Sequence, residues 1–374
     1  MHGITVSKIL LIFLVTVLPS GRGVFGQTNI GGDFVVSKCW TYNSNETVTG
    51  VFVENGRVLL TTAGARVEVL DANGTKQWSS EFGGEVSSNL LGMNGSLVFA
   101  TSADSIGGTK FRESVLRSIS EETGITNWTL KLPPATQFYL NRFNRSLITV
   151  TSSGIILSVD SATGGVIWKR EIAVGFVAKP VLGGGKLYVA GKNNNIFSIL
   201  LSSGEIDSIR KSVDAVKSID ELVAGEIVMG DARGGVSVLN GTNQAVWKFK
   251  TGGEVSRVFS VNDHVIAASF DNFVYYLSGR NGGVKWKKRM PGRVNRIVNV
   301  TDKYVMLSSV EESNAVLVEY DSGKVVGQIL FQPGEEIVAD PAVSGDAIYL
   351  TTDRATYSFG LNGCTAKKKG GTGK

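Results

Sequence analysis

A repeat of about 40 residues, marked by tryptophan, restricts the fold of this sequence more than any other feature. The gaps between successive tryptophans are 38, 50, 40, 79 and 39 residues, at Trp40, Trp78, Trp128, Trp168, Trp247 and Trp286. The gap of 79 equals two periods with one tryptophan missing, and the gap of 50 equals one period with an insertion. A period of this length along a whole chain indicates a propeller or another repeat array.

A turn residue stands four positions before each tryptophan after the first, at Gly74, Gly124, Gly164, Asn243 and Gly282. Two further copies keep this frame without tryptophan: Gly204 leads to Ser208, and Gly323 leads to Gly327. The tryptophan-equivalent positions are therefore 40, 78, 128, 168, 208, 247, 286 and 327, which predicts eight repeats.

Each period also contains pairs of short apolar segments joined by Gly or Asn turns, for example residues 179–190 and 257–268. About four short strands rich in β-branched and aromatic residues fit each period. Four antiparallel strands in forty residues form one propeller blade. The sequence predicts an all-β fold, a single eight-bladed β-propeller of four-stranded antiparallel blades over residues 38–364.

The two ends of the repeat array complement each other. The last period ends at the turn Leu361–Gly363, before a tryptophan strand of its own, whereas Trp40 has no strands before it. Since a closed ring protects sheet edges, we expect the N-terminal strand to complete the last blade. This alignment places Cys39 and Cys364 on one composite outer strand. We predict a Cys39–Cys364 disulfide in an oxidising compartment; the alternative is two reduced, unpaired thiols.

The first 26 residues read as a signal peptide. Lys8 precedes the apolar run Ile9–Leu18, which Pro19 and small residues then interrupt. Residues 27–37 form a lead-in, and residues 365–374 form a basic tail that we expect to be disordered. No run is long enough to span a bilayer, and no cysteine follows the apolar run directly, so we expect neither a transmembrane segment nor a lipid anchor. The predicted location is the periplasm or outside the cell, or an endomembrane lumen in a eukaryote.

Seven Asn-x-Ser/Thr sequences occur, at Asn45, Asn73, Asn94, Asn127, Asn144, Asn240 and Asn299. In a eukaryote several of them could carry sugar on surface loops. They are equally ordinary turn sequences.

The segment Val159–Trp168, with the pattern Val-Asp-x-x-Thr-Gly-x-x-x-Trp, resembles the tryptophan-docking repeat of PQQ-like β-propellers. The resemblance covers residues 38–363 and implies that the tryptophans pack between neighbouring blades. With eight blades and an export signal, the chain looks like the BamB-type outer-membrane assembly factors. That resemblance implies a non-catalytic scaffold for protein–protein interaction, with partners in the cell envelope such as the β-barrel assembly machinery.

Quinoprotein dehydrogenases share the repeat, so a PQQ-dependent or other small-molecule enzyme is the alternative. Those enzymes carry adjacent cysteines, and a calcium-bound quinone needs converging carboxylates. Here Asp231, Asp271 and Asp353 lie in short hairpin turns, where aspartate is common, and we interpret them as turn residues. With two His and two Cys, a His-ligated zinc, a zinc ribbon and a c-type haem are excluded. We expect no catalytic, cofactor or metal site. A sugar- or peptidoglycan-binding module is a third class, without a distinct signature.

Two segments are candidates for partner binding. The basic run that includes Lys287, Lys288, Arg289 and Arg293 could dock an acidic partner or an anionic lipid surface, or it could be a solvated outer strand. The insertion at residues 104–117 departs most from the repeat, and its candidates are Lys110, Phe111 and Arg112. With a net charge of +5 and an export signal, nucleic acid is not an expected partner. We expect a monomeric propeller.

Overall fold

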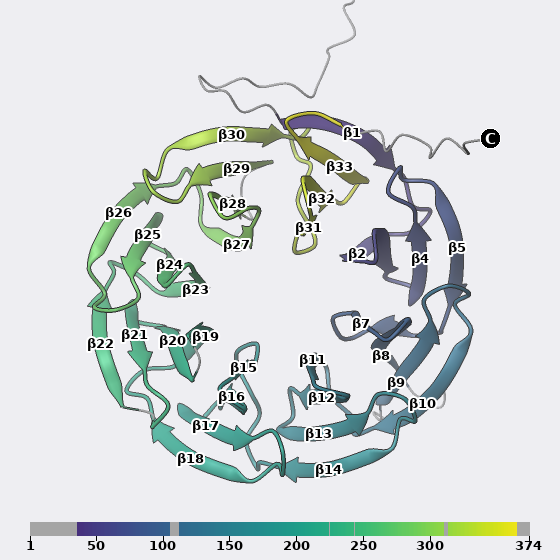
Figure 1. Cartoon of the computed structure of the whole chain (residues 1–374), viewed down its shortest axis with the longest axis horizontal. Coiled ribbons are helices and arrows are strands. Elements are labelled where there is room, and N and C mark those ends of the chain that lie inside the picture. Colours follow the sequence, from purple (N-terminus) through teal and green to yellow (C-terminus); the bar gives the residue numbers. More distant parts are fainter. Residues whose placement is uncertain (1–35, 105–111, 224, 243, 310–312, 365–374) are drawn as a thin grey trace, which may run out of the picture.

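Eight antiparallel sheets stand side by side in a ring around a central channel (Figure 1). The computed structural model describes residues 36–104, 112–223, 225–242, 244–309 and 313–364. Every described element is a β-strand, and the predicted eight-bladed all-β propeller is confirmed. The predicted signal peptide, most of the lead-in and the basic tail lie outside the described residues. In the part of the chain that is described, no helix has the length and hydropathy that crossing a membrane requires.

Each blade runs from an inner strand at the channel to an outer strand at the rim. The inner strands are β2 (Val48–Glu54), β6 (Glu85–Val86) with β7 (Leu91–Met93), β11 (Phe138–Phe143), β15 (Val181–Gly183), β19 (Val216–Val223), β23 (Val255–Val261), β27 (Val294–Asn299) and β31 (Ala342–Ser344). The second strands are β3 (Arg57–Thr62), β8 (Ser96–Asp104), β12 (Ser146–Thr151), β16 (Lys186–Ala190), β20 (Glu226–Asp231), β24 (His264–Ser269), β28 (Tyr304–Ser309) and β32 (Ala347–Thr351).

The third strands are β4 (Arg66–Leu70), β9 (Arg112–Ser120), β13 (Ile155–Asp160), β17 (Asn195–Leu200), β21 (Gly235–Leu239), β25 (Phe273–Ser278), β29 (Asn314–Glu319) and β33 (Thr356–Leu361). The outer strands are β5 (Lys76–Glu81), β10 (Thr126–Leu132), β14 (Val166–Glu171), β18 (Ile206–Lys211), β22 (Ala245–Lys250), β26 (Val284–Arg289), β30 (Val325–Leu330) and β1 (Val36–Tyr42). The eight outer strands carry the eight tryptophan-equivalent positions of the sequence repeat.

The hydrophobic core lies between the blades. The second and third strands are buried on both faces, which is why they read as nearly continuous apolar runs rather than alternating ones. One cluster joins Ile266 of β24 to Leu307 of β28 in the next blade, and similar clusters repeat around the ring. Outer strands alternate half-buried and exposed residues because only one face packs inward. Contacts between neighbouring blades therefore hold the ring together.

A β-bulge positions each tryptophan. The register shifts by one residue between the third and outer strands of all eight blades, close to the tryptophan-equivalent position. Each indole Nε1 donates a hydrogen bond to a carbonyl of the following blade at 2.6–3.1 Å. Trp247 also covers Gly282, whose φ is 70° and where a Cβ would lie 2.6 Å from the indole. Only glycine fits that turn without strain.

The blade that contains the predicted insertion differs from the others. Its inner strand is divided into β6 and β7, which both pair with β8. Strands β8 and β9 are nine residues long each, so Ser114 and Arg117 of the predicted insertion belong to a regular strand. Residues 105–111, which include the candidates Lys110 and Phe111, lie outside the described residues.

The N-terminal strand closes the ring, as predicted. β1 pairs with β33, with Trp40 opposite Ser358, and completes the sheet of β31, β32 and β33 (Figure 1). The predicted Cys39–Cys364 disulfide is present, with a Cα–Cα distance of 5.4 Å. One detail of the prediction was wrong: Cys364 follows the turn after β33 and does not lie on the outer strand. Cys39 sits at the bulge of β1, which brings it beside that turn.

Candidate functional site

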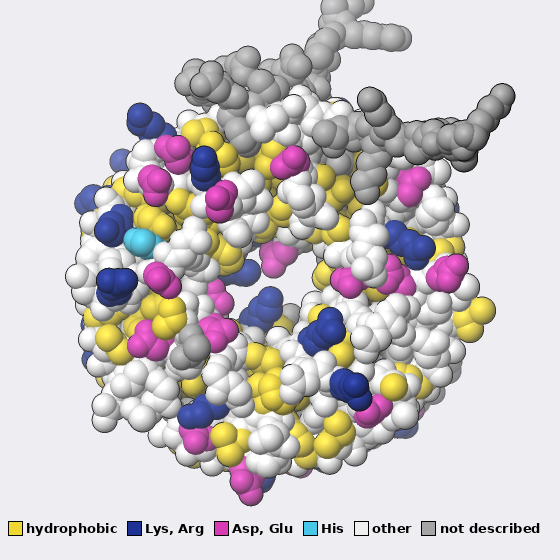
Figure 2. Space-filling view, in the orientation of Figure 1, with side chains coloured by type: hydrophobic (Ala, Val, Ile, Leu, Met, Phe, Trp, Pro, Cys, Tyr) yellow, Lys and Arg dark blue, Asp and Glu magenta, His cyan; other side chains and the backbone are white. Residues whose placement is uncertain are grey.

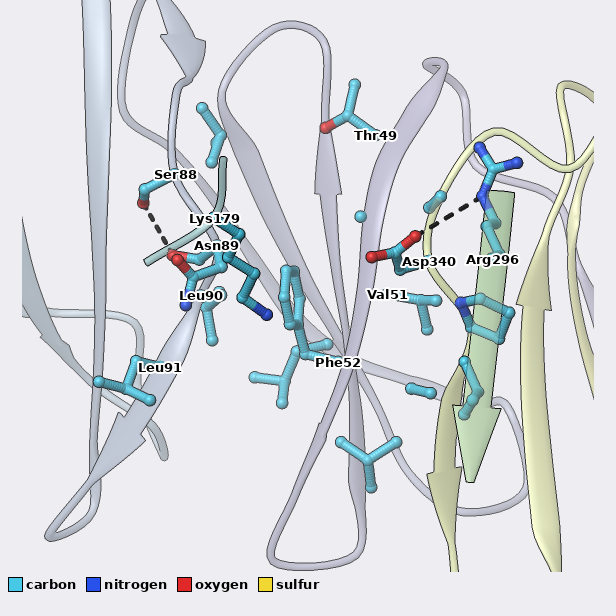
Figure 3. A pocket seen from close by; sticks show the side chains of 18 of the residues that line it. Thr49, Val51, Phe52, Ser88, Asn89, Leu90, Leu91, Lys179, Arg296 and Asp340 are labelled. Atoms are coloured by element: carbon cyan, nitrogen blue, oxygen red, sulfur yellow. Dashed lines mark hydrogen bonds and ion pairs between the residues drawn. The ribbon is translucent and has the colours of Figure 1, made fainter. Parts of the chain in front are cut away.

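A cavity of about 1110 Å³ opens in the central channel. Residues from the inner strands of several blades line it, and Figure 2 shows the ring open at its centre with basic and acidic side chains around the opening. Phe52 of β2 and Lys179, which precedes β15, both point into this space (Figure 3). The channel therefore offers apolar and charged groups together.

Two arginines from neighbouring blades share one carboxylate in the channel. Arg257 Nη2 lies 3.7 Å from Asp340 Oδ2, and Arg296 Nε lies 3.7 Å from Asp340 Oδ1 (Figure 3). The Arg296 side chain is 14% exposed, and burial lowers its pKa from the ordinary arginine value. It keeps its charge, since arginine is protonated throughout the physiological range. The Asp340 side chain is 63% exposed, so the shared carboxylate faces open space that a ligand group could enter.

A second acid lies beside these cations. Burial raises the pKa of Asp220 above its ordinary value, while hydrogen bonds from the Ser260 and Glu221 amides and the charges of Lys179 and Arg257 oppose that rise. A side cavity of about 430 Å³ connects Asp220 with Lys179 and Arg257. This pattern of guanidinium, ammonium and carboxylate groups suits the binding of a charged polypeptide surface.

The three candidate metal-ligating aspartates each accept hydrogen bonds from backbone amides. Asp231 Oδ1 accepts hydrogen bonds from the Arg233 and Gly235 amides, at 2.9 and 2.7 Å. Asp271 accepts from the amides of Gly252 and Phe273 and from the Tyr275 hydroxyl, and Asp353 accepts from the Glu336 amide. Within the described ranges, no group of three or more His, Cys, Asp or Glu side chains is placed to hold a metal ion.

Three of the predicted basic partner-binding residues lie on an outer strand, and the fourth directly precedes the inner strand β27. Lys287, Lys288 and Arg289 belong to β26, and Arg293 follows it. The Lys287 ammonium lies 5.5 Å from the Phe273 ring, and the Arg293 guanidinium lies 4.9 Å from the Phe270 ring, distances typical of cation–π contact. Arg112, the described residue of the other candidate segment, begins β9. Lys287, Lys288 and Arg289 therefore come from an outer strand, whereas Arg257 and Arg296 come from inner strands. Their role in partner binding stays a prediction.

The family model described as outer membrane protein assembly factor BamB matches residues 37–242, more than half of the chain. The chain belongs to this BamB family. No curated protein matches the chain by sequence.

Solved structures with the same fold include BamB from Moraxella catarrhalis, at 12% identity and a TM-score of 0.68, covering 87% of this chain and 100% of that one. The computationally designed Ika8 protein has 12% identity and a TM-score of 0.73 and covers 86% of this chain and 99% of its own. The C-terminal WD40 domain of Sif2 has 11% identity and a TM-score of 0.71 and covers 88% and 99%. At these identities the similarity shows the fold alone.

Sequence reasoning missed the charged residues that this BamB-family chain places in its channel. Their signal was nevertheless in the repeat: Val255-Ser-Arg257-Val and Val294-Asn-Arg296-Ile lie one period, 39 residues, apart. Likewise Lys179 and Asp340 each precede a proline at the start of an inner strand. Aligning the inner strands, rather than the tryptophans alone, would have brought these positions to one level of the channel.

Proposed function

We propose that this protein is an exported, non-catalytic propeller scaffold that binds protein partners of the cell envelope and takes part in outer-membrane protein assembly. The observation that carries the proposal is the BamB family match over more than half of the chain. The eight-bladed ring supports it, because propellers present wide, rigid faces for contact. The disulfide agrees with an oxidising, exported location.

The channel mouth is the partner-binding surface in this proposal. Arg257 and Arg296 can bind carboxylates of a partner through paired N–H groups, while Asp340 and Asp220 can receive its cations. Arginine is the side chain favoured at such interfaces because its planar group is preorganised for carboxylates.

Deletion of the gene in its native host tests the assembly role. We expect lower levels of folded β-barrel proteins in the outer-membrane fraction, measured by quantitative proteomics, and recovery when the wild-type gene is returned. The double variant R257E/R296E should fail to restore these levels, whereas R280E, a single charge reversal on an exposed turn, should restore them. Unchanged barrel levels after deletion would remove the assembly role.

Photo-crosslinking tests the scaffold role separately. A photoreactive amino acid in place of Phe52, at the channel, should capture defined envelope proteins in cells, and the same group in place of Ile167, an exposed residue of the outer strand β14, serves as the comparison. Capture of no protein from the channel position would contradict partner binding there. A quinone titration followed by absorbance, with and without calcium, completes the test, since saturable binding would favour an enzyme instead.

A further inference from the structure

A groove of about 400 Å³ opens at the rim between β18 and the next blade, which is formed by β19 to β22. We call it the rim groove, and its lining residues are Arg210 to Asp214, Met229, Asp231, Gly235 to Ser237 and Lys248 to Lys250. Its residues come from the outer strands β18 and β22, from β20 and β21 and from the loop after β18, and none of these segments contains the channel arginines. Its volume is within the range of about 300–1,000 Å³ that is usual for ligand pockets.

The rim groove exists because two positions of β21 carry unusually small residues. Ser237 pairs with Lys248 at the register position where Phe197 and Tyr275 stand in the two neighbouring blades. Gly235 stands where those blades have Asn195 and Phe273.

The next interface along the ring shows what normally fills this space. There the Tyr275 ring packs against Phe249 of the preceding blade, with centroids 5.5 Å apart. The corresponding pair at the rim groove is Ser237 and Arg210. Arg210, which is polar and flexible, therefore stands in the place of Phe249, and the small Ser237 stands in the place of Tyr275. These replacements leave the space open.

The charges around the rim groove are predominantly positive. Four cations line it, at Arg210, Lys211, Lys248 and Lys250. Its two acids are already engaged: Asp214 pairs with Arg233 at 3.0 Å, and Asp231 accepts backbone amides of its turn. Lys248 is exposed and forms no ion pair with any described residue. The unbalanced charge favours a ligand that carries carboxylates.

Apolar surface accompanies these cations. Met229 and Phe249 are among the lining residues, and Val213 at the edge is 88% exposed. Ile209 of β18 and Val246 of β22 are also exposed, at 55% and 47%. Exposed aliphatic side chains beside a cavity are typical of a surface that a partner covers.

We propose that the rim groove binds an extended acidic peptide segment of a partner, with one apolar side chain inserted in the cavity and flanking carboxylates on the lysines. The proposal rests on the scaffold function. It adds the location of a binding site and the chemical class of the partner segment that binds there. A cavity of this volume accepts one large side chain, which favours a peptide anchor over a flat membrane surface.

The test uses the purified protein and a fluorescent nonapeptide array in which acidic residues flank a central Leu, Phe, Trp or Ser. We expect the apolar-centred peptides to bind in fluorescence anisotropy and the Ser-centred peptide to bind about 10-fold or more weakly. Raising the salt concentration should weaken binding because the flanking contacts are exposed ion pairs. No binding by any apolar-centred peptide, or equal binding by the Ser-centred one, would overturn the proposal.

Two variants locate the site. S237F places in the cavity the residue type that Phe197 provides in the neighbouring blade, so the fold should accept it while peptide binding falls about 10-fold or more. K248E should weaken binding by a similar factor, whereas K169E, at the same register position two blades earlier, should not. Binding that survives S237F with the fold intact, or that responds equally to K248E and K169E, would place the site elsewhere.

Anionic vesicles of phosphatidylglycerol and phosphatidylcholine form the last arm of the test. Sedimentation of the wild-type protein with these vesicles, abolished by K248E, would assign the rim groove to a membrane and overturn the peptide proposal. The scaffold function stands independently, because crosslinking from the channel would still capture partners if the rim groove bound no peptide.

Discussion

Two neighbouring blade interfaces use the same backbone and differ in how they are filled. At the packed interface, between β22 and the blade of β23 to β26, Trp247 covers Gly282 and Phe249 contacts Tyr275. At the open interface, between β18 and the blade of β19 to β22, Ser208 replaces the tryptophan and the rim groove replaces the aromatic pair. The ring closes in both cases, so aromatic packing at every interface is not required for the fold.

A polar contact takes the place of the missing indole at the open interface. Lys186 Nζ donates a hydrogen bond to the Gly241 carbonyl of the next blade at 3.1 Å and lies 2.8 Å from Asp207 Oδ2. Elsewhere a tryptophan Nε1 makes the equivalent bond to the following blade. A directional bond between blades is therefore retained while the apolar area is lost.

The largest expected effect comes from removing the Trp247 indole at the packed interface. W247A should lower the free energy of unfolding by about 3–5 kcal/mol, because the residue is buried and leaves a cavity between two blades. S208A at the equivalent position of the open interface should change it by less than about 0.5 kcal/mol. Urea unfolding followed by tryptophan fluorescence and circular dichroism measures both. Equal losses in the two variants would mean that the interfaces do not differ in packing energy.

The disulfide extends the comparison to the blade that the N-terminal strand β1 completes. The interface after β30 also lacks tryptophan, with Gly327 at that position, and the Cys39–Cys364 bond lies in the blade that follows. The double variant C39S/C364S should lose about 2–4 kcal/mol, because the bond closes a loop of more than 300 residues in the unfolded chain. The reduced wild-type protein should behave like the variant. Identical unfolding curves with and without reductant would contradict this.

Lys186 tests the polar contact of the open interface. K186M should cost about 1 kcal/mol, because it removes the bond to Gly241 and leaves the half-exposed Asp207 carboxylate without its cation. Its hydrogen bond with Lys186 lowers the pKa of Asp207, so this contribution is present at neutral pH and is lost as pH falls below about 4. The difference between wild type and K186M should therefore shrink in acid. K285M, at an exposed position of the outer strand β26, is the control and should cost less than about 0.5 kcal/mol at any pH.

The sequence predicted the packed interface far better than the open one. Tryptophan spacing gave the blade count, the outer strands and the closure, because a buried ring that covers a turn glycine constrains residues on both sides of an interface. The rim groove depends on Ser237 and Gly235, which look like ordinary strand residues until register places them opposite Lys248 and Lys250. The channel pair of Arg257 and Arg296 required the inner strands to be aligned as well. Small residues leave space only in relation to their neighbours, and single-sequence patterns do not contain that relation.

The smallest expected effect concerns two aspartates whose contributions to the free energy of unfolding depend on pH with opposite signs. Asp271 holds the Tyr275 hydroxyl of the packed interface at 2.6 Å; although burial alone would raise its pKa, hydrogen bonds from Tyr275 and from the Phe273 and Gly252 amides lower it. Asp220, in the blade of the open interface, has its pKa raised by burial. A lowered folded-state pKa adds stability above about pH 4 that is lost as pH falls, whereas a raised one removes stability as pH rises.

D271N should therefore be less stable than wild type at pH 7 by up to about 1 kcal/mol and approach it at pH 3, below the ordinary aspartate pKa, where the stability given by the ionised carboxylate is being lost. D220N should be as stable as wild type at pH 3 and more stable at pH 7, since asparagine keeps the acceptor for the Ser260 amide without a buried charge. Urea unfolding at pH 3, 5 and 7 gives both slopes. Parallel slopes would mean that Asp271 does not favour its ionised form, and the contact with Tyr275 would then add packing but no charge-dependent stability to the packed interface.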